Sequence, residues 1–201
     1  MKKRVAVFVS GGGTNLQTLL DAQANGLLQS GEIALVISSK AGVYALERAE
    51  KAGVPAFAVP RKDLGLEGFE ARSLELLEEY KIDYMVTAGF LTIFTEDFIK
   101  RFPNKMINVH PALIPAFCGK GFYGLRVHEA ALERGVKLTG ATVHFVTEVC
   151  DGGPILAQKA VDVLPGDTPE VLQRRVMEQA EWVLLPQALE MVCATPPEST
   201  P

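Results

Sequence analysis

Two polar side chains with catalytic potential stand two residues apart in Asn108-Val-His110-Pro111. They end an apolar run that starts at Met106 and is typical of a buried strand, and alternation along a strand places Asn108 and His110 on one side. An amide donates hydrogen bonds, and an imidazole donates when protonated, so the pair could stabilise an oxyanion forming on a carbonyl carbon. The alternative is an ordinary core histidine whose hydrogen bonds are satisfied within the fold.

A carboxylate that could serve the same chemistry stands in Asp151-Gly-Gly-Pro154, after a strand-like run that carries Thr142 and His144. If Asp151 lies beside His110, we expect its charge to raise the imidazole pKa toward neutral pH and to fix the ring's orientation. Asp-Gly-Gly-Pro is equally an ordinary turn. The preceding Cys150 has no evident helix terminus or cation beside it, which favours a small packing residue over a nucleophile.

A third candidate is the glycine loop Ser10-Gly-Gly-Gly-Thr-Asn15, which joins an apolar run to a helical pattern. Such a turn leaves backbone N–H groups free at a helix N-terminus, where the helix dipole also favours a phosphate. The loop is not the dinucleotide motif GxGxxG, because Leu16 takes the place of the third glycine, and no Lys-Ser/Thr pair follows to make a Walker A loop. A tight turn without a ligand is the alternative.

The elements that must position these residues alternate between strands and helices. Apolar runs that predict buried strands lie at residues 4–9, 33–37, 56–59, 84–87 and 106–109. Strands that are apolar on both faces and alternate with amphipathic helices are typical of a parallel sheet covered on both sides. We therefore predict an α/β fold, a doubly wound, Rossmann-like and mostly parallel sheet, with ligands beyond the carboxyl ends of its strands.

After Pro111 the pattern is mixed. The glycine-rich stretch 118–124 predicts a mobile surface loop, residues 127–134 a short helix, and residues 141–146 and 155–163 two further strands. Asp167-Thr-Pro-Glu170 has the residue types that open a helix, which we expect to reach about Pro186, with a helical remainder toward Cys193. We predict one domain over residues 1–194 and a disordered tail over 195–201, where few apolar side chains could pack.

Composition excludes several classes of function. The 201 residues carry 20 Lys and Arg against 24 Asp and Glu, a net charge of −4, so we expect no nucleic-acid partner. The first apolar run is too short for a signal peptide, and no window approaches the roughly 20 apolar residues of a membrane span, so we expect no membrane association. Three cysteines without a CxxC pair fit a reducing compartment, and we place the chain in the cytoplasm. The three histidines lack the HxH or HxxxH spacing that favours metal ligation, so we expect no metal.

Five segments taken together resemble the folate-dependent phosphoribosylglycinamide formyltransferase family: Ser10–Leu16, Ala88–Leu91, Asn108–Pro115, Gly140–Val146 and Asp151–Ile155. The resemblance covers residues from about 3 to 190. The pairing of Asn-x-His-Pro with a later Asp-x-Gly-Pro is shared by the wider superfamily that uses 10-formyltetrahydrofolate, whereas the glycine loop is narrower. Methionyl-tRNA formyltransferase carries an additional C-terminal domain and formyltetrahydrofolate deformylase a preceding one, and we expect neither here from the length and the start of this sequence.

The resemblance implies transfer of the formyl group of 10-formyltetrahydrofolate to the amine of glycinamide ribonucleotide, in purine biosynthesis and with no covalent enzyme intermediate. It implies small-molecule substrates only, and it leaves monomer and homodimer both open. A 10-formyltetrahydrofolate hydrolase and a non-catalytic module that binds phosphate metabolites are the alternatives.

The resemblance also assigns roles to site residues. The catalytic positions match Asn108, His110 and Asp151, and a supporting position matches His128. The phosphate site matches Gly13, Thr14 and Asn15, and the ribose site matches Glu181. The implied folate site consists of Leu91, Thr92, Ile93, Phe94, Asn108, Thr147, Glu148, Val149, Cys150 and Asp151. Two departures stand out. Leu66 takes the place of an arginine that often meets the folate tail, and the loop before His128 is lengthened through Phe117–Tyr123.

Overall fold

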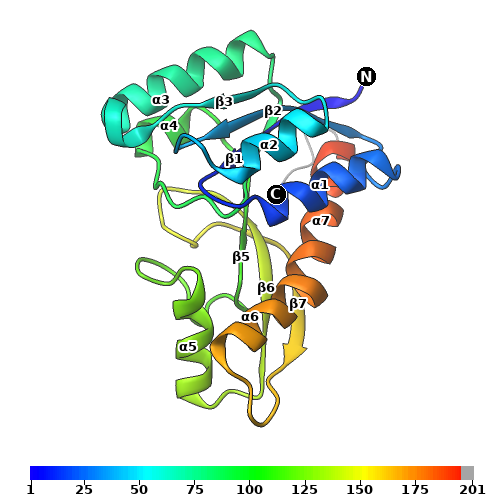
Figure 1. The fold of residues 1–201 in the computed structure, drawn as a ribbon, viewed down its shortest axis with the longest axis vertical. Coiled ribbons are helices and arrows are strands. Elements are labelled where there is room, and N and C mark those ends of the chain that lie inside the picture. The colour runs from blue at the N-terminus through cyan, green and yellow to red at the C-terminus, as the bar shows by residue number, and fades with distance from the viewer. Residues whose placement is uncertain (196–201) are drawn as a thin grey trace.

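The valine-rich runs form the centre of a seven-stranded sheet in the computed structural model, which describes residues 1–195 (Figure 1). The strands are β1 Lys3–Val9, β2 Gly31–Ser38, β3 Ala56–Ala58, β4 Tyr84–Thr87, β5 Met106–His110, β6 Leu138–Phe145 and β7 Ile155–Asp162. Every predicted strand is present, with ends that differ by at most three residues, and the strand predicted at residues 84–87 has those bounds. The predicted tail lies outside the described residues from residue 196 onward.

The strand order is β3-β2-β1-β4-β5-β6-β7. Strands β1 to β5 run parallel, whereas β6 pairs antiparallel with both β5 and β7. The predicted doubly wound sheet with a mixed C-terminal part is therefore confirmed. Because the chain proceeds outward in both directions from β1, the carboxyl ends of β1 and β4 flank the crevice where ligands bind in open α/β sheets.

The helices cover both faces of the sheet. They are α1 Thr14–Ala24, α2 Tyr44–Lys51, α3 Arg61–Glu79, α4 Glu96–Lys100, α5 Leu125–Arg134, α6 Pro169–Val176, the π-helical turn η1 Met177–Glu181 and α7 Trp182–Ala194. Among the described residues, no helix is both long enough and apolar enough to cross a membrane.

The helix expected to reach about Pro186, with a helical remainder toward Cys193, runs without interruption through that proline to Ala194. Proline removes one backbone donor and costs about 3 kcal/mol inside a helix. Helix α7 nevertheless buries Leu184, Leu185 and Leu189, and fully burying such side chains contributes roughly 1.5–3 kcal/mol each. Packing therefore outweighs the cost of the proline and joins the two predicted helical segments.

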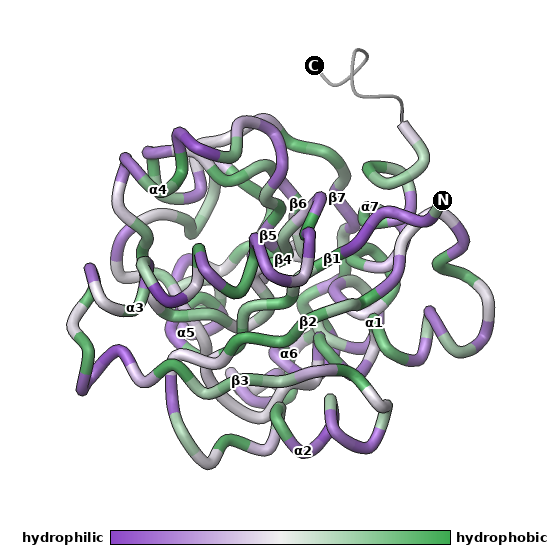
Figure 2. Tube along the Cα trace, turned by 90° about the horizontal axis from the view of Figure 1, so that it is seen from above, coloured by the Kyte–Doolittle hydropathy of each residue, from purple (hydrophilic) through white to green (hydrophobic). Residues whose placement is uncertain are grey.

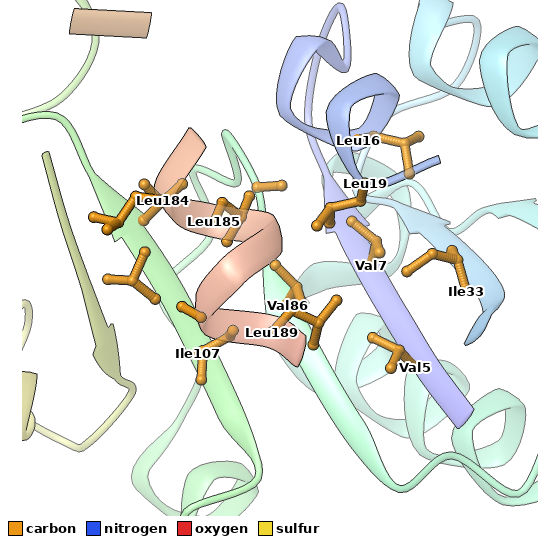
Figure 3. Close-up of a cluster of buried hydrophobic side chains, with 14 of the residues drawn as sticks. Val5, Val7, Leu16, Leu19, Ile33, Val86, Ile107, Leu184, Leu185 and Leu189 are labelled. Atoms are coloured by element: carbon orange, nitrogen blue, oxygen red, sulfur yellow. The ribbon is translucent and has the colours of Figure 1, made fainter. Parts of the chain in front are cut away.

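Two apolar clusters lie on opposite faces of the sheet. Val5 and Val7 of β1 pack with Leu19 of α1 and with α7 (Figure 3), whereas the alternate residue Phe8 packs against Phe69 of α3 on the other face. In Figure 2 the central strands are mostly green and much of the periphery is purple. A strand buried on both faces fixes its neighbours firmly, so the loops at its carboxyl end are held on a rigid base.

Candidate functional site

The loops that follow β1, β4 and β5 enclose a cavity of about 620 Å³, hereafter the larger cavity. A smaller cavity of about 110 Å³ opens beside it. Asn108 and Asp151 line both cavities. Of the predicted site residues, the larger cavity is lined by Asn15, Leu91, Thr92, Ile93, Asn108, His110, His128, Cys150, Asp151 and Glu181.

His110 and Asp151 come together as the chemistry requires. The Nδ1 atom of His110 lies 3.5 Å from Oδ2 of Asp151, and the two side chains are only 5% and 11% exposed. Asp151 itself stands at φ 54°, a left-handed conformation that aspartate adopts more readily than most residues. The turn Asp151–Pro154 therefore does more than reverse the chain: it holds a carboxylate against the imidazole.

The charge states of this pair differ from the sequence prediction. Burial lowers the pKa of His110, and the opposing effects of Asp151 and of the Phe117 carbonyl do not fully offset it. The predicted effect of Asp151 is present, because its charge raises the pKa of His110, but desolvation disfavours the imidazolium more strongly and leaves the pKa below its ordinary value in the free protein. Burial acts to raise the pKa of Asp151, but the His144 and His110 rings, whose protonated forms favour the carboxylate, and the Gly119 N–H outweigh it and hold this pKa below its usual value. At neutral pH the free site thus holds an ionised carboxylate beside a neutral imidazole.

A loop rests directly on the pair. The carbonyl oxygen of Phe117 lies 2.8 Å from Nε2 of His110 and accepts its hydrogen bond. The backbone N–H of Gly119 donates to Oδ2 of Asp151 at 2.8 Å. Phe117 adopts φ 50° to reach this position. A substrate oxygen that is to accept from Nε2 of His110 must displace the Phe117 carbonyl, so the loop must shift during binding.

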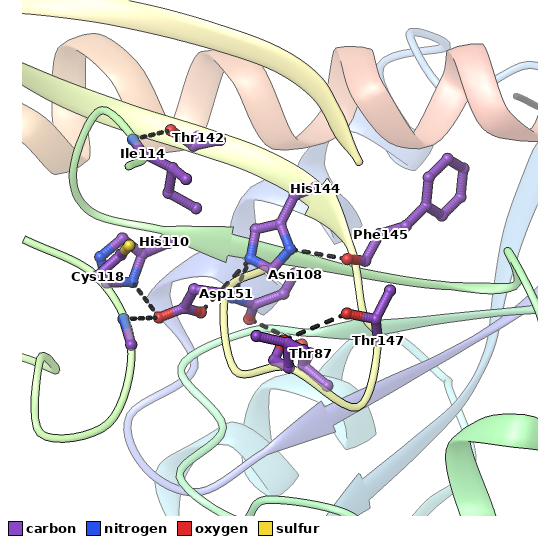
Figure 4. Close-up of polar contacts among 12 residues, drawn as sticks. Thr87, Asn108, His110, Ile114, Cys118, Thr142, His144, Phe145, Thr147 and Asp151 are labelled. Carbon is purple, nitrogen blue, oxygen red and sulfur yellow. Dashed lines mark hydrogen bonds and ion pairs between the residues drawn. The ribbon is translucent and has the colours of Figure 1, made fainter. Parts of the chain in front are cut away.

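Asn108 belongs to a hydrogen-bonded row that the sequence did not predict (Figure 4). The hydroxyl of Thr87 lies 2.8 Å from its Oδ1 atom, and Nε2 of His144 lies 3.2 Å from its Nδ2 atom. Thr87 is a polar residue at the end of a buried strand, the same signal that singled out Asn108. His144 is also 3.5 Å from Asp151.

His128 is completely buried, and neither of its ring nitrogens has a hydrogen-bond partner. Burial, with a smaller effect from His110, lowers its pKa from 6.5 to about 4. The ring is therefore neutral at physiological pH. A buried unpartnered N–H costs about 1–3 kcal/mol. The position of His128 at the larger cavity therefore lowers the free energy of unfolding.

The predicted phosphate and ribose residues meet at the start of α1. The Asn15 amide donates to Oε2 of Glu181 at 2.9 Å, and both side chains are buried. Burial raises the pKa of Glu181, while the Asn15 hydrogen bond opposes it. Glu181 ends the π-helical turn η1, an element that recurs at functional sites. Thr14 is exposed in the first helical turn, whose backbone N–H groups have no acceptor within the helix.

Gly13 has a structural role as well. It stands at φ 72°, and a Cβ atom there would lie 2.7 Å from Cβ of Ala45 on α2. Both its conformation and its contact therefore exclude a side chain. Gly12 has open space around it, and its carbonyl accepts a hydrogen bond from Arg48 at 2.8 Å.

The implied folate residues gather at the smaller cavity: Thr92, Ile93, Phe94, Asn108, Thr147, Glu148, Val149, Cys150 and Asp151. Ile93 and Val149 are 59% and 66% exposed at its rim, and exposed apolar groups flanking a cavity are typical of a ligand site. Cys150 is exposed here, so its prediction as a packing residue is wrong. The loop 147–151 carries it outward instead of into the core.

A third cavity, of about 390 Å³, adjoins Leu91 and Thr92 and is lined by Lys40, Arg61 and Lys62. We call it the basic cavity. Leu66, where the resemblance implies an arginine, follows a kink at Gly65 (φ 70°) in α3, and Arg61 and Lys62 precede that kink.

Within residues 1–195, no group of three or more His, Cys, Asp or Glu side chains has an arrangement that could hold a metal ion.

Comparison with known proteins identifies relatives of this chain. The formyl transferase family model matches residues 3–189. A chloroplastic phosphoribosylglycinamide formyltransferase of Arabidopsis thaliana is 38% identical over 96% of this chain and 66% of its own. The human trifunctional purine biosynthetic protein adenosine-3 is 42% identical over 96% of this chain and 18% of its own. This chain thus spans about two thirds or less of these curated relatives.

A solved structure of phosphoribosylglycinamide formyltransferase from Brucella melitensis is 40% identical, covers 98% of both chains and has a TM-score of 0.87. The resemblance stated from the five sequence segments is confirmed by these matches. The chain belongs to the formyl transferase family.

Proposed function

We propose that this protein transfers the formyl group of 10-formyltetrahydrofolate to the primary amine of glycinamide ribonucleotide. The observation that carries the proposal is the His110–Asp151 pair beside Asn108, at the junction of the two cavities. The relatives named phosphoribosylglycinamide formyltransferase support the choice of substrates. The products are N-formylglycinamide ribonucleotide and tetrahydrofolate, within purine biosynthesis.

The two substrates fit different parts of the site. The larger cavity extends from His110 to Asn15 and Glu181, where the N–H groups of the first turn of α1 favour a phosphate and the carboxyl of Glu181 can accept from ribose hydroxyls. The smaller cavity, with its apolar rim, suits the flat ring of the folate. Placing an amine and a formyl carbon at the junction makes the reaction effectively intramolecular, which supplies much of the acceleration.

The chemistry forms a C–N bond between the amine and the formyl carbon and breaks the bond from that carbon to folate N10. The oxygen carries negative charge in the tetrahedral intermediate, and N–H groups of Asn108 and His110 stabilise it. One proton leaves the attacking amine and one proton reaches N10. The neutral imidazole that burial favours is able to take up a proton, and the ionised Asp151 stabilises the imidazolium while it lasts.

The folate tail ends in glutamate carboxylates. We propose that the basic cavity receives them, because Lys40, Arg61 and Lys62 line it and Leu91 and Thr92 connect it with the larger cavity. These cations would take the part that the resemblance assigns to an arginine at the position of Leu66.

The cellular location of the protein and its oligomeric state stay predictions. Cys118, Cys150 and Cys193 are free thiols, which supports the cytoplasm or another reducing compartment. Monomer and homodimer both fit the site, because every residue used above comes from one chain.

The experiment is product analysis with and without the amine substrate. Tetrahydrofolate and N-formylglycinamide ribonucleotide should form in equal amounts when glycinamide ribonucleotide is present. Tetrahydrofolate and formate formed at the same rate without it would establish a hydrolase instead. No turnover, with binding of phosphate compounds alone, would favour the non-catalytic module.

A further inference from the structure

The side chains of Thr87, Asn108 and His144 lie next to one another across three adjacent strands (Figure 4). Thr87 on β4 is in register with Asn108 on β5, which is in register with His144 on β6. Residues paired in this way on neighbouring strands project to the same face. Thr87 is 5% exposed and His144 is 2% exposed, so the row opens to the cavities mainly at Asn108.

The His144 ring sets the direction of the hydrogen bonds. Its Nδ1 atom lies 2.8 Å from the carbonyl oxygen of Phe145, which only accepts, so Nδ1 carries the proton. In the neutral ring Nε2 is then an acceptor, and it lies 3.2 Å from Nδ2 of Asn108. The 3.5 Å between Nε2 and Oδ1 of Asp151 is longer than an ordinary hydrogen bond. The NH₂ group of Asn108 therefore faces His144.

Thr87 reinforces that orientation from the opposite side. Its hydroxyl lies 2.8 Å from Oδ1 of Asn108, and an amide oxygen only accepts, so the hydroxyl donates. If the amide turned over, its oxygen would face the lone pair of His144 Nε2, and the Thr87 hydroxyl would exchange its 2.8 Å contact with Oδ1 for the longer one, 3.3 Å, to the carbonyl oxygen of Ile107. Buried polar groups left in this way are costly.

We propose that Thr87 is a positioning residue for formyl transfer, which holds the Asn108 amide with its N–H groups directed away from β4. This rests on the proposed function, in which Asn108 donates to the oxyanion. An amide nitrogen carries two N–H donors, and His144 takes one of them, so the second is left for the substrate oxygen. A turned amide would present an oxygen to the oxyanion, and attraction would become repulsion.

The test is Thr87→Val, which keeps the shape of the cavity wall and removes the hydroxyl. We expect kcat to fall roughly ten-fold, part of the 10²–10³-fold effect of losing an oxyanion donor outright. The KM of both substrates should stay within about two-fold, because the lost interaction acts in the transition state. Thr87→Ser restores the hydroxyl and should recover most of the rate. Thr139→Val is the matched control, since Thr139 is a buried strand threonine whose hydroxyl has no partner.

A double-mutant comparison separates positioning from a general structural effect. In the Asn108→Ala background, Thr87→Val should cost nothing further, because its only route to the reaction is gone. The same loss in both backgrounds, a wild-type kcat in Thr87→Val, or failure of Thr87→Ser to recover the rate would each overturn the proposal. Should Thr87→Val not fold, ¹⁵N spectra of the wild-type His144 ring decide: Nδ1 must carry the proton, and protonation at Nε2 alone would overturn the assignment.

These outcomes are distinct from failure of the proposed function. If the wild-type protein forms no N-formyl product from glycinamide ribonucleotide, the proposed function fails. If the wild type is active and the Thr87 variants behave otherwise than stated, only the role of Thr87 fails.

Discussion

Stability should depend on pH through His128 in a way that can be isolated by one substitution. The pKa of this buried imidazole falls from 6.5 to about 4 on folding, so between these values the unfolded chain binds a proton that the folded protein does not. Stability must then decrease as pH falls. The full difference corresponds to about 3 kcal/mol, at 1.36 kcal/mol for each pKa unit, and about 2 kcal/mol of it is lost between pH 7 and pH 5.

His128→Leu removes this contribution and replaces two unpartnered nitrogens with apolar atoms. Urea unfolding of both proteins at pH 7, 6 and 5 gives the two free energies of unfolding. The variant should be at least as stable as the wild type at pH 7, and its advantage should grow by about 2 kcal/mol on going to pH 5. Other titrating groups affect both proteins alike. Parallel pH dependences would mean that the folded ring accepts a proton as readily as the unfolded chain and that its pKa is not lowered.

Three further predictions concern the site and the thiols. His110→Ala and Asp151→Asn should each lower kcat by about 100-fold, and steady-state kinetics of the double mutant should show less than the product of the two losses; a full product would mean that they act independently. Gly12→Val, which meets open space, should weaken binding of glycinamide ribonucleotide at least ~10-fold, while calorimetry shows folate binding unchanged; equal loss of both would mean that the fold is damaged. Alkylation at pH 8 followed by mass spectrometry should modify exposed Cys150 but not buried Cys193, whose pKa burial raises to about 12; modification of Cys193 in the folded protein would contradict its placement.

The strands were predictable because their signal is local. Continuous apolar runs such as residues 4–9 and 84–87 have no face to expose, so burial on both sides follows from the run itself. The end of a helix is less local. Pro186 predicts a break, but the contacts that hold α7 together come from α1 and the sheet, far away in sequence.

The candidate site divides in the same way. Strand alternation alone singled out Asn108 and His110. That Asp151 lies beside them was implied only by the resemblance, and the structure shows the contact with His110. The direction of the His110 pKa shift depends on how deeply the ring is buried beside Asp151, and the depth of burial cannot be seen in the sequence. Thr87 was missed because its importance lies in the register between β4 and β5, and that pairing is set by the whole sheet.

The central claim is that Asn108, His110 and Asp151 move a formyl group from folate to the amine of a phosphorylated acceptor. The most direct test follows ¹³C-labelled formyl of 10-formyltetrahydrofolate by NMR in three parallel reactions, with glycinamide ribonucleotide, with its dephosphorylated riboside, and with buffer alone. We expect label in the amide of the ribonucleotide and no labelled formate. Transfer to the riboside should be at least ~10-fold slower at subsaturating concentration, because the phosphate contacts are lost. Labelled formate produced at one rate in all three reactions would contradict the central claim.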